Sequence, residues 1–238
     1  MSSIPMVEIK DLNVCFHQKK TNINAVNGVN LTVNKGEVVA LLGESGSGKS
    51  VTLRALMRLH SEKTTTLSGS ICIDGQEIIA MNNRQLQKLR GSKVAMIFQE
   101  PLLAFDPVYT IGQQITEAIR KHQGLSRKQS RDHALEALRS VHIPSPEERL
   151  DSFPHEMSGG MRQRAMIAQA LACNPELLLA DEPTTALDAT VQIQILILLR
   201  NLQRELGLSI IFVTHDIGAA IEVADRVAVM YGGKIVEQ

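Results

Sequence analysis

Hydrophobic and polar residues alternate along two segments near the start of the sequence. Residues 6–17 and 23–33 place apolar side chains at nearly every second position, as in VEIKDLNVCF and AVNGVNLTV. A period of two is typical of β-strands that bury one face and expose the other. We therefore expect antiparallel strands in the first part of the chain.

Four later segments are continuously apolar instead. They are EVVALL (37–42), VAMIF (94–98), LLLAD (177–181) and SIIFVT (209–214). Short apolar runs of this kind are typical of parallel strands that are covered on both faces. The last segment, RVAVMYGGKIVEQ, predicts a hairpin with its turn at Gly232 and Gly233.

Between Gln99 and Pro154 the pattern has a helical period and contains no apolar run of the strand type. Apolar residues recur at helical spacing at Ile111, Ile115 and Ala118, and again at Ala134, Leu135 and Leu138. This interval therefore predicts a helical insertion.

Together, the patterns predict an α/β fold with a mostly parallel sheet, an antiparallel β-subdomain and an inserted helical subdomain. No Gly/Ser-rich or Pro-rich linker divides the 238 residues, which favours a single domain. We place its core and β-subdomain at about 1–98 and 165–238, and its helical subdomain at about 100–164.

Composition narrows the possible functions. The 25 Lys and Arg residues balance the 25 Asp and Glu residues, so the chain lacks the basic charge of a sequence-independent nucleic-acid binder. Cys15, Cys72 and Cys173 form no C-x-x-C pair, which predicts reduced, buried thiols rather than a disulfide framework or a zinc site. Without a signal peptide or an apolar run long enough to span a bilayer, we expect a soluble cytosolic protein.

A glycine-rich loop follows the first buried strand. Residues 43–50, GESGSGKS, match G-x-x-x-x-G-K-[ST] and precede the helix-compatible segment VTLRALMRL. In such a P-loop the backbone N–H groups point at phosphate oxygens, Lys49 reaches the β- and γ-phosphates, and the Ser50 hydroxyl ligates Mg²⁺. The alternative is a chance turn rich in glycine and serine. The predicted nucleotide-binding residues are Gly43, Ser45, Gly46, Ser47, Gly48, Lys49, Ser50 and Val51.

Two adjacent carboxylates, Asp181 and Glu182, end the buried run LLLAD. Ligands of parallel sheets bind at the carboxyl edge of the strands, which is where these two residues are expected. We assign Asp181 to the Mg²⁺ shell and Glu182 to the general base that accepts the proton of the attacking water. Pro183 then stops the strand. A solvated acidic turn is the alternative.

Three further residues lie at strand ends. His215 follows SIIFVT, and Gln99 follows VAMIF. Either could be an ordinary polar group, but beside a P-loop and a carboxylate pair we expect each to contact the γ-phosphate or the lytic water, with Gln99 also near the metal. Phe16 ends the first strand, where it could stack on adenine or pack in the core.

The order of these motifs resembles that of the ATP-binding subunits of ABC transporters, from about residue 7 to the end. The P-loop, Gln99, MSGGM, LLLADEPTTALD and His215 occur in that family's order and approximate spacing. The resemblance places Ser158, Gly159 and Gly160 in the signature motif, usually L-S-G-G-Q, with Met157 and Met161 as departures. It implies a P-loop NTPase core that binds ATP and Mg²⁺.

SGGMRQR, ADEPTTALD and MIFQEP are similar, more narrowly, to importer subunits that energise the uptake of peptides, glutathione, nickel or opines. Residues 102–107, LLAFDP, depart from that subfamily's M-T-S-L-N-P, so contacts to the membrane partner are expected to differ. Members also tend to continue past the last strand. We therefore expect a shortened form that stops at Gln238.

Ser158 is placed to cap a helix through GMRQRAMIAQALA, which would leave the N–H groups of Gly159 and Gly160 facing outward as an anion site. The resemblance implies a head-to-tail dimer in which this helix covers the ATP held by the other subunit, with Asp188 also reaching across. An ordinary capped helix is the alternative. The charged Arg162 and Arg164 are interpreted as a solvated face.

The predicted function is an ATP-hydrolysing subunit that powers an importer for peptide-like substrates or nickel. The resemblance implies as partners a second ATP-binding subunit, identical or paralogous, two membrane permease subunits, and an extracytoplasmic substrate-binding protein. It also implies a peripheral location on the cytoplasmic face of the inner membrane. The alternative is a soluble ABC-type ATPase acting on nucleic acid or ribosomes, against which we count the short interval between Lys49 and Asp181.

Overall fold

The structure is a computed structural model that describes residues 4–17, 21–185 and 187–238. The chain divides into two units, one of Met1–Gln87 with Arg200–Gln238 and one of Lys88–Leu199. Helices α2 (Asn83–Leu89) and α8 (Ala189–Leu206) each contain a point where the chain passes from one unit to the other. Within the described ranges, no helix has the length and apolarity needed to cross a membrane.

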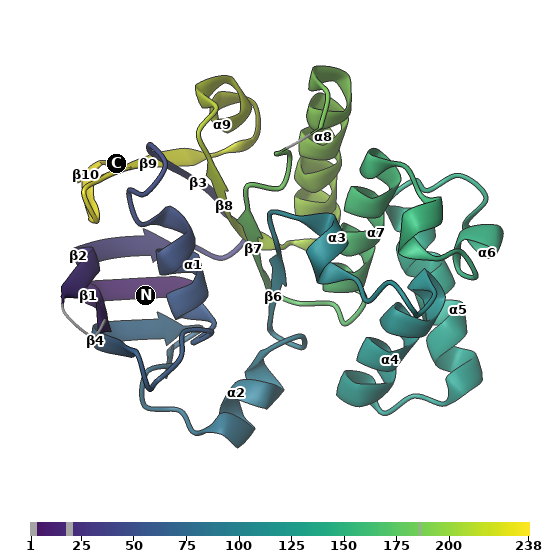
Figure 1. Ribbon diagram of the computed structural model, residues 1–238, viewed down its shortest axis with the longest axis horizontal. Coiled ribbons are helices and arrows are strands. Elements are labelled where there is room, and N and C mark those ends of the chain that lie inside the picture. Colours follow the sequence, from purple (N-terminus) through teal and green to yellow (C-terminus); the bar gives the residue numbers. More distant parts are fainter. Residues whose placement is uncertain (1–3, 18–20, 186) are drawn as a thin grey trace. The chain divides into compact units, whose positions relative to one another are not determined.

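The first unit contains an antiparallel sheet with the strand order β2-β1-β4-β5 (Figure 1). Its strands are β1 (Val7–His17), β2 (Asn22–Val33), β4 (Thr65–Ile73) and β5 (Gln76–Glu77). β1 and β2 confirm the strands expected at 6–17 and 23–33. The sequence pattern did not predict β4, which pairs with β1 along most of its length.

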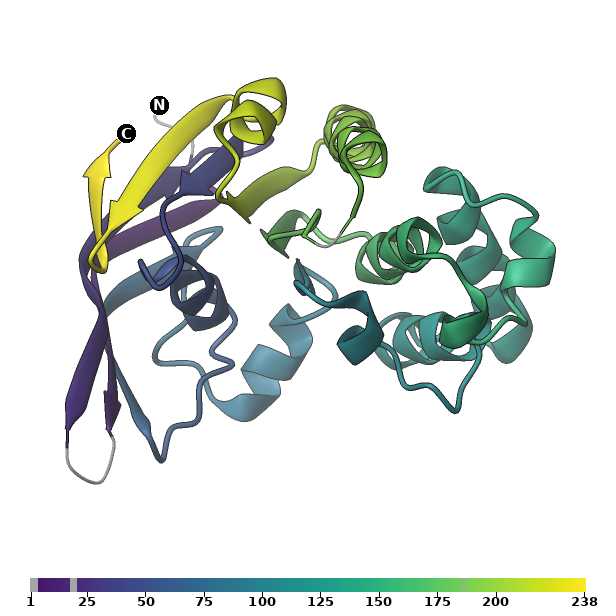
Figure 2. The same ribbon diagram turned by 45° about the horizontal axis from the view of Figure 1, so that its top comes forward.

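The same unit holds a second group of strands in the order β10-β9-β3-β8, visible with the β9–β10 hairpin in yellow in Figure 2. The elements are β3 (Val38–Leu42), α1 (Lys49–Leu56), β8 (Ser209–Thr214), α9 (Ile217–Val223), β9 (Arg226–Tyr231) and β10 (Lys234–Glu237). β3 pairs in parallel with β8 and β9, and every residue of β3 and β8 is buried. The predicted parallel strands and the terminal hairpin are confirmed.

The second unit combines two parallel strands with a group of helices, teal and green in Figure 2. Its elements are β6 (Val94–Ile97), α3 (Pro101–Ala104), α4 (Ile111–Gln123), α5 (Arg127–Ser140), α6 (Pro146–Arg149), a 3₁₀ turn (Pro154–Glu156), α7 (Gly159–Leu171) and β7 (Leu177–Asp181). α4 and α5 begin at capping boxes formed by Thr110 and Ser126. The helices expected between Gln99 and Pro154 are therefore present.

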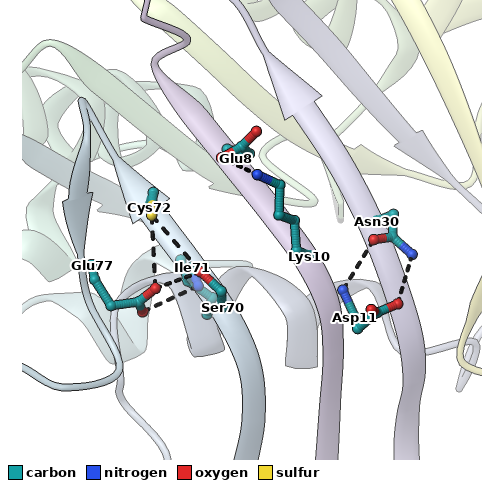
Figure 3. A network of polar contacts seen from close by, with 8 residues as sticks. All are labelled: Glu8, Lys10, Asp11, Asn30, Ser70, Ile71, Cys72 and Glu77. Carbon is teal, nitrogen blue, oxygen red and sulfur yellow. Dashed lines mark hydrogen bonds and ion pairs between the residues drawn. The ribbon is translucent and has the colours of Figure 1, made fainter.

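A polar network covers part of the antiparallel sheet (Figure 3). The Glu77 carboxylate accepts hydrogen bonds from the Ser70 hydroxyl and from the N–H groups of Ile71 and Ile79. Burial raises the pKa of Glu77, but these hydrogen bonds outweigh burial and hold the pKa below its ordinary value. The network fixes the β4–β5 corner.

The helix after the P-loop ends at Leu56, within the helix-compatible segment 51–59, because Arg58 adopts a left-handed φ of 46° that interrupts the helix. One expectation needs correction. All three thiols are free, but only Cys173 is buried, while Cys15 and Cys72 are partly exposed. Burial raises the pKa of the Cys173 thiol.

Candidate nucleotide site

The P-loop of the first unit curls around an ammonium group. It connects β3 to α1, and the Lys49 side chain points back so that Nζ donates to the carbonyl oxygens of Gly43 and Glu44, at 2.7 and 2.8 Å. Lys49 is only 4% exposed. A positive charge thus lies beside the N-terminus of α1, where anions are favoured.

Gly48 shows why this loop needs glycine. Its φ is 104°, and a Cβ atom there would lie 2.5 Å from the carbonyl oxygen of Ala25. Any other residue would have to adopt a strained backbone and displace β2. Beside it, Ser47 Oγ is buried and has no hydrogen-bond partner among the described residues. The loop therefore fits a phosphate group, which is both an anion and an acceptor.

Phe16 and His215, also in the first unit, occupy the predicted strand ends. Phe16 is the penultimate residue of β1 and is half-buried. His215 directly follows β8 and is exposed, and the next residue, Asp216, caps α9 by accepting from Ala219 N at 3.2 Å. The turn after β8 is thus held by a helix cap.

In the second unit, the structure brings Gln99 and Glu182 together. Asp181 ends β7 and is completely buried, and Glu182 follows with a left-handed φ of 47°. Glu182 Oε2 accepts from Gln99 Nε2 at 3.2 Å and from Thr185 Oγ1 at 2.9 Å. The carboxylate expected to act on water is therefore oriented by two donors. The sequence analysis did not identify Thr185. Its position three residues after Glu182 was the only signal for the hydrogen bond between the two side chains.

The signature segment begins α7 as predicted. Ser158 is the N-cap, and its Oγ accepts from Met161 N at 3.3 Å. An added Cβ on Gly159 would lie 3.7 Å from Leu187, an ordinary contact, whereas one on Gly160 would lie 3.0 Å from Val191 Cγ1 in α8. Gly160 thus allows α7 and α8 to approach closely.

Arg162 and Arg164 do not form the solvated face that the sequence suggested. Both are partly buried, and Arg162 donates to the carbonyl oxygen of Met157. Arg164 donates to the carbonyl oxygen of Val141 at 2.8 Å and to Gln194 Oε1 at 3.3 Å. Burial lowers the pKa of the Arg164 guanidinium. Both arginines tie the start of α7 to neighbouring segments.

Asp188 begins α8. Its Oδ1 accepts from Val191 N at 3.0 Å, and its carbonyl oxygen accepts from Gln192 N at 2.9 Å. The exposed side chain therefore caps this helix in the isolated chain. Ala186, in the preceding TTALD segment, lies outside the described residues.

Comparison with known proteins gives consistent matches. The profile of the family described as ABC transporter matches residues 26–185. A probable peptide ABC transporter ATP-binding protein of Sinorhizobium fredii is 48% identical, over 98% of this chain and 70% of the relative. The oligopeptide transport ATP-binding protein OppD of Bacillus subtilis is also 48% identical, over 98% of this chain and 65% of the relative.

Solved structures show the same similarity. The ATP-binding cassette MJ0796, determined as a dimer and also as a dimer in a post-hydrolysis state with ADP and Pi, is 32% identical with a TM-score of 0.86. The match covers 98% of this chain and 97% of that one. The predicted fold class, a P-loop core with a parallel sheet, an antiparallel β-subdomain and an inserted helical subdomain, is confirmed.

Proposed function

The chain belongs to the ABC transporter family, and from that premise we propose that it binds and hydrolyses ATP to power an importer of peptide-like substrates. The observation that carries ATP binding is the Lys49 ammonium held inside the P-loop. The cargo class rests on the two relatives named for peptide and oligopeptide transport. Neither name mentions nucleic acid or ribosomes, so the alternative function has no support.

We propose the same residue roles as those expected from the sequence. Residues 43–51 hold the phosphates, with Lys49 at the β- and γ-phosphates and Phe16 at the base. Ser50, Gln99 and Asp181 supply oxygen ligands of the kind that Mg²⁺ prefers. Mg²⁺ held by these residues would supply positive charge that offsets the charge developing on the phosphates. We propose that residues 1–238 form one ATPase domain, with a helical subdomain at about 100–164.

Hydrolysis needs a group that accepts a proton from water. We assign this step to the Glu182 carboxylate, because two donors, Gln99 and Thr185, orient its Oε2 atom. His215 and Gln99 are assigned contacts to the γ-phosphate or the lytic water.

The signature helix is assigned to the ATP of a second subunit, which is an identical chain or a paralogue. Ser158, Gly159 and Gly160 form a capped helix start, a site that favours anions. Asp188 is proposed to contact the same partner. Closure of the dimer would then depend on contacts that exist only while the γ-phosphate is present.

We further propose that the second unit docks two membrane permease subunits, which in turn engage an extracytoplasmic substrate-binding protein. This places the chain on the cytoplasmic face of the membrane. A cavity of about 350 Å³ supports a docking role for the helices, since Tyr109, Gln113, Arg120, Arg127 and Arg131 of the α4–α5 region line it. Arg131 is paired with Asp151 at 2.8 Å and Glu117 also lines the cavity, so Arg120 and Arg127 are the cations proposed to favour an acidic segment of a permease.

Complementation between two inactive variants tests the shared site. Lys49→Ala disables a chain's own P-loop but leaves its signature helix intact. Ser158→Arg disables the signature helix but leaves the P-loop intact. Mixed dimers rebuild one of the two sites, so random pairing should recover about a quarter of normal ATPase activity if sites are independent, and less if they are coupled. The variants are supplied with the membrane subunits so that both positions of the dimer are filled. With subunit exchange demonstrated, activity no greater than the sum of the separate variants would reject the shared site.

A further inference from the structure

A second aromatic ring lies beside Phe16. The segment after α1 folds back, so that His60 Nε2 donates to the carbonyl oxygen of Val51 at 3.0 Å. Val51 is the residue directly after the P-loop motif, in the first turn of α1. The His60 ring is therefore fixed next to the predicted phosphate site although it follows the loop by ten residues.

The His60 ring contacts the Phe16 ring. The two centroids are 5.3 Å apart and the ring planes meet at 82°, an edge-to-face arrangement that aromatic pairs favour. Both side chains are half-buried. His60 thus restricts the orientation of Phe16 from the side of α1.

Strands β2 and β4 flank Phe16 within the antiparallel sheet. It lies opposite Ile23 on β2 and Thr65 on β4, so these three side chains share one face of the sheet. The neighbouring His17 N donates to the carbonyl oxygen of Thr64 at 2.8 Å, which ties the segment carrying His60 to the end of β1. Ring and backbone contacts therefore position Phe16 together.

We propose that His60 is a positioning residue for the base of the nucleotide. It holds the Phe16 ring in the orientation that stacks on the base and links that ring to the first turn of α1. This inference rests on the proposed ATP binding, but it concerns the base and not the phosphates. His60 should therefore affect ligands that carry a base and leave base-free polyphosphates unaffected.

The test compares two ligands, Mg-ATP and Mg-tripolyphosphate, by titration calorimetry on the full chain. His60→Ala should weaken ATP binding by roughly 2- to 10-fold, the range that corresponds to one aromatic pair, with tripolyphosphate binding unchanged. Phe16→Ala should show the same selectivity, and adding His60→Ala to it should change little. His60→Gln retains a donor for Val51 but lacks the ring, so it should resemble His60→Ala.

Leu59→Ala is the matched control, because Leu59 is the preceding residue and is 41% exposed. It should leave binding of both ligands unchanged. Equal weakening of ATP and tripolyphosphate by His60→Ala would mean that His60 supports the P-loop instead, and unchanged ATP binding would also overturn the inference. Wild-type protein that binds neither ligand would contradict the proposed function itself, which separates the two failures.

Discussion

Replacing Gly160 with alanine tests the close approach of α7 to α8. The new Cβ would lie 3.0 Å from Val191 Cγ1, tighter than ordinary contact, whereas the same change at Gly159 meets Leu187 at 3.7 Å. Val191 lies in α8, where a valine has one strongly preferred rotamer, so its side chain cannot simply turn away. The strain must then move one of the helices.

The expected change in the free energy of unfolding follows from two opposing effects. Alanine in place of glycine stabilises a helix by up to about 1 kcal/mol, and this gain applies at both positions. Overpacking costs about 1–3 kcal/mol, and it applies only at Gly160. We therefore expect Gly160→Ala to lower the free energy of unfolding by about 1–3 kcal/mol relative to Gly159→Ala.

Urea unfolding without nucleotide, followed by circular dichroism, measures both variants. Val191→Ala removes the opposing methyl groups, so the double variant with Gly160→Ala should be more stable than the sum of the two single changes predicts, by roughly 1 kcal/mol or more. Equal stability of the two alanine variants, or strictly additive effects in the double variant, would refute the steric argument.

Three other changes test separate features. Glu182→Gln should retain Mg-ATP binding but lower turnover by roughly 10²- to 10⁴-fold, and normal steady-state ATPase activity would place the base elsewhere. Arg164→Met should cost about 1.5–3 kcal/mol in urea unfolding because two hydrogen bonds from a charged donor are lost, with Gln194→Ala costing much less. A hydrogen bond from Arg200 lowers the pKa of Asp225, so its contribution to stability is present above the unfolded pKa of about 3.9 and is lost as pH falls through the folded value. Asp225→Asn should therefore flatten the acid limb of a stability–pH curve, and an unchanged limb would count against this ion pair.

The elements that could be predicted are those whose buried residues follow one another closely in the sequence. Residues 38–42, VVALL, are all apolar, and SIIFVT has a continuous apolar centre, and the strands β3 and β8 that they form are buried at every residue. The P-loop could also be predicted, because its glycines and Lys49 act within a span of eight residues. In these cases the chemistry of each segment determines its own conformation.

Strand β4 could not be predicted for the opposite reason. Its sequence, TTLSGSICI, is half polar and does not alternate strictly, and its burial is irregular. It becomes a strand through pairing with β1, whose partners from Val7↔Ile73 to Phe16↔Thr65 lie 66 to 49 residues earlier in the chain. Long-range pairing of this kind overrides a weak local preference.

The candidate nucleotide site also combines features that the sequence predicts with features that it does not. The sequence placed Gln99 and Glu182 at strand ends, but it did not pair their side chains, which lie 3.2 Å apart at the hydrogen-bonding atoms. It also assigned one task to Gly159 and Gly160, whereas their steric surroundings differ. Side-chain contacts across elements depend on packing that a motif does not encode.

The two arginines near the start of α7 connect this packing to the proposed role of the signature motif. Cations in the first turns of a helix are unfavourable, because the helix dipole already makes that end positive. Hydrogen bonds from Arg162 to Met157 and from Arg164 to Val141 offset this cost. The two arginines therefore hold the start of α7 in place through these contacts. The anion preference of the proposed site then comes from the Ser158 cap and the N-terminal N–H groups of α7, which supports the proposed contact with a phosphate of the partner's ATP.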